Sequence, residues 1–151
     1  MDDAVDHVIL AEVCRDGRVT LAQLSERVGL STSAVQSRLK RLETRGAITG
    51  YQAVLDAEQV GKPLSAFIEI TPIDPAQPDT APELLERLAE IEACHSIAGD
   101  ASYMLFVRVA SPRALEALVN DIRAIANVRT QTTIVLQTYY ERRPMVTGPS
   151  D

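Results

Sequence analysis

Residues 30–46 (LSTSAVQSRLKRLETRG) constrain this chain most, because one predicted helix there concentrates positive charge. Four cations outweigh the single Glu43 in this segment, and they are Arg38, Lys40, Arg41 and Arg45. The segment therefore carries +3, whereas the whole chain carries −6 and the remainder −9. A cationic helix on an anionic protein favours contact with phosphate at one place on the surface.

Helical periodicity divides this segment into an apolar face and a polar face. Val35, Leu39 and Leu42 fall at i, i+4 and i+7, a stripe typical of packing against neighbouring helices. The polar face is predicted to bind DNA through Ser31, Thr32, Ser33, Gln36, Ser37, Arg38, Lys40 and Arg41. We expect the arginines to face outward, and their pairing with carboxylates of the same subunit would count against the DNA-binding interpretation. The alternative is a solvated helix face without a partner.

The residues before this helix predict two more helices. Thr20 and Gln23 have the spacing of a capping box, and Gly29 tolerates the positive φ of a tight turn before Ser31. An earlier apolar stripe indicates a first helix with Val5, Val8, Ile9 and Val13. Three short helices with a glycine turn between the second and third predict a helix-turn-helix module, simple or winged.

The pattern changes after Gly46. Residues 47–56 alternate in the manner of a strand and lead into a link punctuated by glycine and proline. We assign residues 1–50 to a helix-turn-helix DNA-binding domain and 51–63 to a linker strand. Residues 64–141 then form a second domain, and 142–151 a flexible tail without a chemical role.

The second domain is predicted to have the element order βαββαβ. The strands are expected at 64–71, 93–99, 103–110 and 128–140. One helix should begin at a capping box of Thr80 and Glu83 and continue to Ile91, and another should begin at Ser111. The fold class is thus α+β, a helix-turn-helix (winged-helix-like) domain followed by a ferredoxin-like domain.

A ferredoxin-like sheet has both helices on one face and leaves the other face open. Phe67, Met104 and Phe106 fall on that open face by strand alternation. We therefore predict that they form a homodimer interface by contact between two sheets. The alternative is that they cover loops of the same chain.

Composition limits the remaining possibilities. No apolar run is long enough for a membrane span and the N-terminus lacks a signal-peptide pattern, so we expect a cytoplasmic, nucleoid-associated protein without a membrane partner.

Cys14 and Cys94 are expected to be reduced, small buried hydrophobes, with a redox-sensing pair as the alternative. His7 and His95 lack metal-ligand spacing, so no metal and no catalytic residue are predicted.

Three segments resemble the Lrp/AsnC, or feast/famine, family of bacterial and archaeal transcriptional regulators. They are residues 16–51 (DGRVTLAQLSERVGLSTSAVQSRLKRLETRGAITGY), 94–109 (CHSIAGDASYMLFVRV) and 128–136 (VRTQTTIVL). The Pro-rich segment at 71–79 (TPIDPAQPD) is similar to the actinobacterial members. The resemblance implies an N-terminal module that binds double-stranded DNA and a C-terminal RAM/ACT-like domain that responds to an amino acid.

The resemblance also implies an effector site and a large assembly. Family members hold an amino acid near the GD loop at contacts between dimers, which implicates Gly99, Asp100, Ser102, Tyr103 and Thr132. Many members have an aspartate where this chain has Ser102, so one carboxylate for the ammonium group is missing. On composition alone this loop is an ordinary hairpin turn. The resemblance implies no cofactor besides the effector, and assembly of homodimers into octamers or related rings.

Two other functions fit the same fold. Sirohaem decarboxylases share the two-part architecture, although this chain offers only His7 and His95 for such chemistry. An architectural protein that compacts DNA without an effector is the other alternative.

Overall fold

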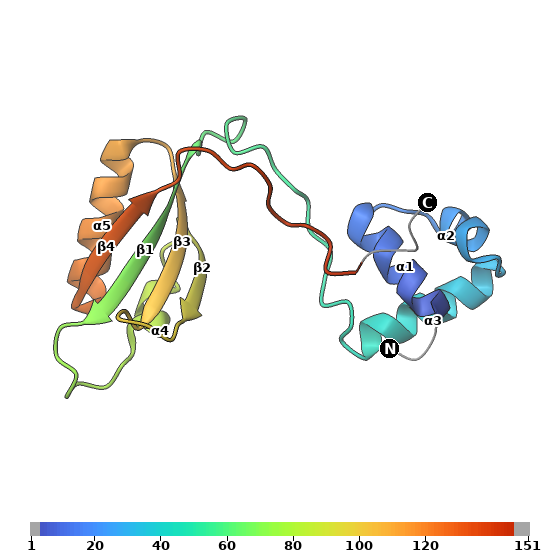
Figure 1. Ribbon diagram of the computed structural model, residues 1–151, viewed down its shortest axis with the longest axis horizontal. Coiled ribbons are helices and arrows are strands. Elements are labelled where there is room, and N and C mark those ends of the chain that lie inside the picture. Colours follow the sequence, from blue (N-terminus) through green and yellow to red (C-terminus); the bar gives the residue numbers. More distant parts are fainter. Residues whose placement is uncertain (1–3, 147–151) are drawn as a thin grey trace. The chain divides into compact units, whose positions relative to one another are not determined.

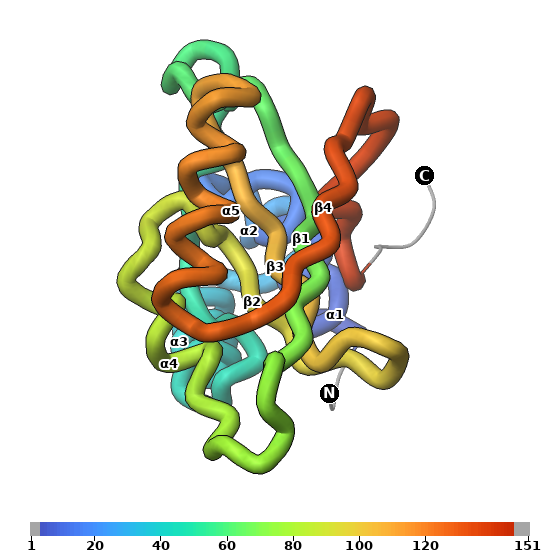
Figure 2. Tube along the Cα trace, turned by 90° about the vertical axis from the view of Figure 1, so that its left-hand side faces the viewer, coloured from blue at the N-terminus to red at the C-terminus, as the bar shows by residue number. Residues whose placement is uncertain are grey.

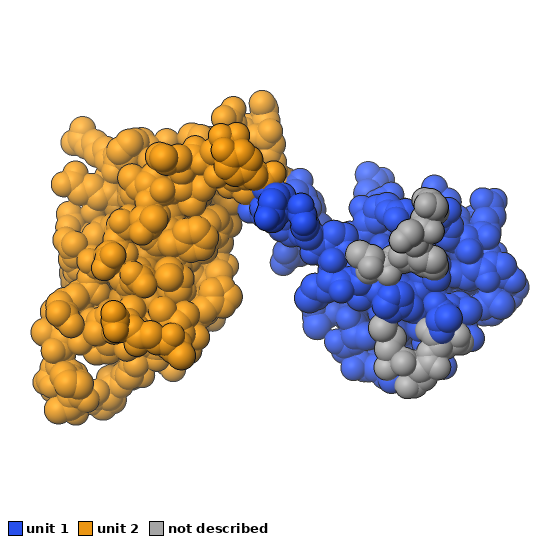
Figure 3. Space-filling model, viewed as in Figure 1, with its two compact units in different colours: residues 1–54, 140–151 blue, residues 55–139 orange. Residues whose placement is uncertain are grey.

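The computed structural model describes residues 4–146. They divide into two compact units (Figure 3), one made of residues 4–54 with 140–146 and the other of residues 55–139. Each unit has its own apolar core. The units thus meet at residues 54/55 and 139/140, where the sequence placed boundaries after residues 50 and 141.

The first unit is a bundle of three helices, α1 (Ala4–Arg15), α2 (Leu21–Val28) and α3 (Thr32–Thr44) (Figure 1). The capping box at Thr20 is present in full, and Gly29 adopts a φ of 69° and donates its N–H to the Ser25 carbonyl. The helices pack around a core of Ile9, Leu10, Leu24, Val35 and Leu42. The predicted helix-turn-helix is confirmed.

The predicted linker strand at 51–63 is wrong. All four strands among the described residues belong to the sheet of the second unit, so no strand partners this segment. Residues 57–61 instead form a turn, in which Lys62 donates its N–H to the carbonyl of Ala57. Without a strand there, the described residues after α3 form no β-wing, because strand alternation alone does not supply backbone partners.

The second unit contains a four-stranded antiparallel sheet with the order β2-β3-β1-β4. Its strands are β1 (Leu64–Pro72), β2 (Ile91–Ser96), β3 (Tyr103–Val109) and β4 (Val128–Ile134). The helices α4 (Ala81–Leu85) and α5 (Pro112–Ala126) lie on the same face of this sheet (Figure 2). The predicted ferredoxin-like arrangement is confirmed.

Strand alternation produces the core of the second unit. Ala66, Ile68 and Ile70 of β1 are fully buried and lie beside Val107, Leu105 and Tyr103 of β3. The helices complete this core with Leu85, Leu115, Leu118 and Ile122. The intervening residues point to the other face, where Phe67 is 42% exposed.

Three predicted elements are shorter in the structure. The helix expected to reach Ile91 ends at Leu85, and the Thr80 side chain makes no cap. Two turns follow, in which the Leu88 N–H donates to the Leu85 carbonyl and the Ile91 N–H to the Leu88 carbonyl, because Ile91 must pair with Val107 in β2. β2 ends at Ser96, where the turn to β3 begins. β4 ends at Ile134 because its partner strand β1 begins at Leu64.

The predicted flexible tail, residues 142–151, is exposed over most of its described part. Residues 140–146 belong to the first unit, and Val146 packs against the core of the three-helix bundle. Residues 147–151 lie outside the described part of the chain. Among the described tail residues, Val146 alone is partly buried, and Met145 is 99% exposed.

Candidate DNA interface and effector site

The outward face of α3 carries short polar side chains and one lysine. Thr32, Ser33, Gln36, Ser37 and Lys40 are all exposed. Ser31 is the N-cap of α3: its hydroxyl accepts a hydrogen bond from the Ala34 N–H at 3.3 Å and lies 3.1 Å from the Ser33 hydroxyl. The sequence therefore located this polar row correctly on an exposed helix face.

Arg38 and Arg41 do not extend freely from α3 as predicted. Nη1 of Arg38 lies 2.9 Å from Oδ1 of Asp6, and Nη2 of Arg41 lies 2.7 Å from Oδ2 of the same carboxylate. The Arg38 side chain is 26% exposed and that of Arg41 48% exposed. Two cations of the predicted DNA-binding face are thus paired within the subunit, which corrects the expectation that they face outward.

Asp6 is a buried partner of this helix face that the sequence analysis missed. It lies in the first turn of α1 with its side chain only 1% exposed. With Ile9 and Leu10 it follows helical spacing, so a carboxylate occupies a position of the buried stripe. A buried carboxylate needs a partner, and an acidic residue on an apolar stripe was the signal that could have revealed the two arginines.

A second contact ties the segment after α3 to that helix. The Tyr51 hydroxyl donates a hydrogen bond to Oε1 of Glu43 at 2.8 Å. Partial burial, this hydrogen bond and the negative charge of Glu43 raise the pKa of Tyr51 to about 12. The phenol therefore stays protonated, and remains a donor, throughout the neutral range.

The residues predicted to bind an effector separate into two groups. Gly99, Asp100 and Ser102 lie in the connection between β2 and β3, where the Ser102 N–H donates to the Ile70 carbonyl at 3.0 Å. Tyr103 and Thr132 stand opposite the buried Ile70 and Ile68, hence on the face that the helices cover. The Tyr103 hydroxyl donates to Asp79 at 2.8 Å, which raises its pKa. The structure does not bring all five residues together.

A hollow on the open face of the sheet adjoins the loop of Asp100. It has a volume of about 470 Å³ and is lined by Glu69, Thr71, Asp100, Ala101, Arg129, Thr130 and Gln131. Register pairs Glu69 with Gln131 and Thr71 with Arg129, so these side chains share one face. The hollow thus combines one guanidinium with two carboxylates, the complement of an α-amino acid's carboxylate and ammonium. Arg129 and Glu69 were not predicted.

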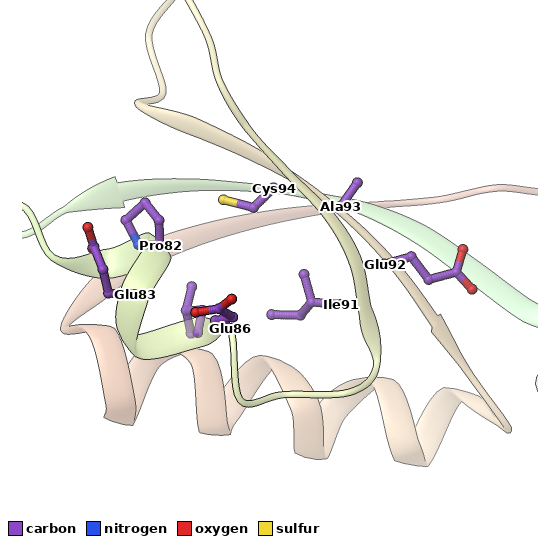
Figure 4. A pocket seen from close by; sticks show the side chains of 8 residues that line it. Pro82, Glu83, Glu86, Ile91, Glu92, Ala93 and Cys94 are labelled. Carbon is purple, nitrogen blue, oxygen red and sulfur yellow. The ribbon is translucent and has the colours of Figure 1, made fainter. Parts of the chain in front are cut away.

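Another hollow lies between α4 and β2 and has different chemistry (Figure 4). Its volume is about 320 Å³, and Leu85 and Ile91 line it together with Glu83, Glu86 and Cys94. Neither lysine nor arginine lines it, so it offers no cation for an amino acid's carboxylate. The hollow beside Asp100 therefore suits an amino acid better.

Both cysteines are exposed, which corrects the prediction that they are buried. Cys94 lies on β2, an edge strand with a neighbour on one side only, and Cys14 lies in the last turn of α1. Desolvation, followed by the charges of Asp79 and Glu83, raises the pKa of the Cys94 thiol. The two cysteines belong to different units.

The open face of the sheet carries an aromatic pair. The rings of Phe67 and Phe106 stand opposite each other in the register of β1 and β3, with centroids 5.1 Å apart. The Arg108 guanidinium lies 5.2 Å from the Phe106 ring centroid and donates to Glu92 at 3.0 Å. Met104 is half-buried on the same face. The three predicted interface residues thus share one surface.

Comparison with known families identifies both parts of the chain. Residues 3–43 match the AsnC-type helix-turn-helix domain, and residues 65–145 match the Lrp/AsnC ligand binding domain. Among the described residues, no helix is long and apolar enough to cross a lipid bilayer.

Individual relatives extend over nearly the whole chain. The HTH-type transcriptional regulator LrpA of Mycobacterium tuberculosis is 55% identical over 141 residues, which cover 93% of this chain and 94% of the relative. A feast or famine regulatory protein of M. tuberculosis complexed with L-methionine is 54% identical, with a TM-score of 0.93 and coverage of 95% and 98%. A Neisseria meningitidis transcriptional regulator in an L-methionine complex is 29% identical, with a TM-score of 0.85 and coverage of 99% and 97%.

The raised pKa of Cys94 predicts a slowly reacting thiol. In a Cys14→Ser variant, alkylation of Cys94 by iodoacetamide near pH 8 should be slower than that of free cysteine, because the thiolate is the nucleophile. Glu83→Gln in the same background should speed the reaction by removing one charge that disfavours the thiolate, whereas the distant Glu116→Gln should not. Alkylation as fast as that of free cysteine would contradict the raised pKa.

Proposed function

Because this chain belongs to the Lrp/AsnC family of transcriptional regulators, we propose that it is a sequence-specific DNA-binding regulator whose assembly responds to an amino acid. The observation that carries this proposal is the exposed polar face of α3 on an AsnC-type helix-turn-helix. The regulator would act on the chromosome, in the cytoplasm. Neither matching domain describes an enzyme, so we infer that the chain regulates rather than catalyses.

The proposed DNA contact uses the exposed row of α3. Ser33, Gln36 and Ser37 offer hydroxyl and amide groups of the kind that read base edges in the major groove. Thr32 and Lys40 flank that row and suit phosphate oxygens, the hydroxyl as a donor and the ammonium as a charge. Ser31 stabilises the start of the helix as its N-cap.

Lys40→Gln tests this assignment. Loss of one phosphate contact should weaken binding to duplex DNA and reduce the slope of log K against log salt concentration by about 0.9. Fluorescence anisotropy titrations at several salt concentrations measure this slope. Lys62→Gln, which removes the same charge outside the three-helix bundle, is the control and should leave the slope unchanged. Equal slopes for both variants and the parent would exclude Lys40 from the interface.

We also propose a homodimer formed through the open face of the sheet. Phe67, at 42% exposure, pairs with Phe106 on the face opposite α4 and α5, where no described helix of the second unit lies, and a second copy would stabilise such a face. A two-fold dimer sets two recognition helices about 34 Å apart, or a multiple of that, and so reads an imperfect palindrome. Dimers would then associate into octamers or related rings.

Phe67→Asp should convert the protein to monomers. Two carboxylates buried in a symmetric contact would repel each other and remain unsolvated. Light scattering after size-exclusion chromatography measures the mass, and circular dichroism checks that the fold is kept. Ile73→Asp, at an exposed position beyond β1, should leave the mass of the assembly unchanged. A Phe67→Asp protein that keeps the parent's mass would refute this interface.

For the effector we propose a free α-amino acid bound in the hollow beside Asp100. Arg129 would hold its carboxylate, and Asp100 with Glu69 would accept hydrogen bonds from its ammonium group. Glu69 thereby supplies a carboxylate that Ser102 does not. The L-methionine found with two related regulators supports an apolar amino acid. Gly99 and Ser102 would shape the loop, whereas Tyr103 and Thr132 would act from the helix-covered side.

A thermal-shift screen of the twenty amino acids tests the effector site. A ligand that binds the native state should raise the transition temperature, with L-methionine among the active compounds. Arg129→Gln should abolish the shift, because the carboxylate would lose its cation. Arg113→Gln on α5, which removes the same charge, should retain it. If no amino acid shifted the transition of the parent or altered its assembly, the effector proposal would fail.

A further inference from the structure

The ion pairs of Asp6 divide the cations of α3 into two classes. Arg38 and Arg41, one helical turn apart, both point to the Asp6 carboxylate on α1, whereas Lys40 is exposed. We propose that Asp6 is a specificity-determining residue, which withholds the two arginines from DNA phosphates. This inference rests on the proposed contact between α3 and DNA.

Geometry supports retention of both arginines. Each oxygen of the carboxylate accepts from a different guanidinium, at 2.9 Å for Arg38 and 2.7 Å for Arg41. These are charge-assisted hydrogen bonds of normal length. With both arginines in place the Asp6 side chain is 1% exposed, so its charge depends on them for most of its stabilisation. If either guanidinium moved to a phosphate, one oxygen of the buried Asp6 carboxylate would therefore lose its cationic partner.

Withholding the arginines changes the balance between two kinds of binding. Contacts between cations and phosphates are independent of sequence and supply most of the non-specific affinity. Contacts of Gln36 and the serines with base edges depend on sequence. A helix face with fewer available cations therefore has a lower affinity for phosphates, while its contacts with base edges are kept. The ratio of specific to non-specific affinity therefore rises, at the expense of total affinity.

If the role of Asp6 were purely structural, a different outcome would be expected. If Asp6 only joined α1 to α3, its loss would lower thermal stability and would weaken binding to every duplex. If it withholds charge, its loss should strengthen binding to random-sequence DNA. The two interpretations therefore differ in the sign of one measured change.

The main experiment compares Asp6→Asn with Glu12→Gln in the full-length protein. Both changes remove one negative charge from α1, and Glu12 also pairs with two arginines, Arg15 and Arg27, neither of which lies on α3. Binding is measured by anisotropy against a random-sequence duplex of about three helical turns and against a site selected with the parent protein. Circular dichroism melting monitors the fold of each variant.

We expect Asp6→Asn to raise affinity for the random duplex about tenfold and to steepen the salt slope by about 1 to 2, since up to two cations are released. The ratio of specific to random affinity should fall. Glu12→Gln should change the slope by less than about 0.5. An unchanged or weaker affinity of folded Asp6→Asn for random DNA, or an equal effect of Glu12→Gln, would overturn the proposal.

A second comparison does not depend on the folding of Asp6→Asn. Arg41→Gln removes a paired arginine, and Lys40→Gln removes the exposed neighbour. The slope should be unchanged for Arg41→Gln and reduced by about 0.9 for Lys40→Gln. An equally large reduction of the salt slope for Arg41→Gln would show that Arg41 reaches phosphate, and would refute the proposal that Asp6 withholds this arginine. Failure of the parent to bind any duplex would instead refute the proposed DNA-binding function.

Discussion

Among the described residues, the helices of the second unit cover one face of its sheet and leave the other open, and the surfaces of that unit follow from this constraint. Alternate residues of β1 and β3 must either join the core with α4 and α5 or stand on the opposite face. The Phe67 and Phe106 pair and the hollow with Arg129 both belong to that opposite face. A proposed dimer contact and a proposed ligand site thus lie on the same open face, because the helices bury only the other face of the sheet.

In the three-helix bundle, packing also decides which charged groups are paired and which are exposed. The stripe of α1 buries Asp6 among apolar residues, and the carboxylate is tolerated there because Arg38 and Arg41 satisfy both oxygens. The polar row from Ser33 to Lys40 remains open to solvent on the other side of α3. The packing of the bundle and the electrostatics of the surface proposed to face DNA therefore depend on the same contacts.

Sequence reasoning succeeded where a pattern is local. The capping box at Thr20, the turn at Gly29 and the N-cap at Ser31 depend on residues within one turn of each other. It failed where an element needs a remote partner. The residues after Gly46 alternate like a strand but pair with none of the described strands, and the helix after Thr80 stops early because Ile91 pairs with Val107. In the hollow proposed as the effector site, the sequence indicated Asp100 but not Arg129.

Periodicity and short-range motifs were thus sufficient for the two-part architecture, the polar face of α3 and the family resemblance, since each reflects spacing along the chain. Only the folded chain revealed that Asp6 neutralises two arginines, that Tyr103 turns to Asp79, and that Glu69 and Arg129 share a hollow with Asp100. These residues are far apart in sequence and meet through helix packing or strand register. Electrostatic pairing depends on distance in space, which spacing along the chain does not specify.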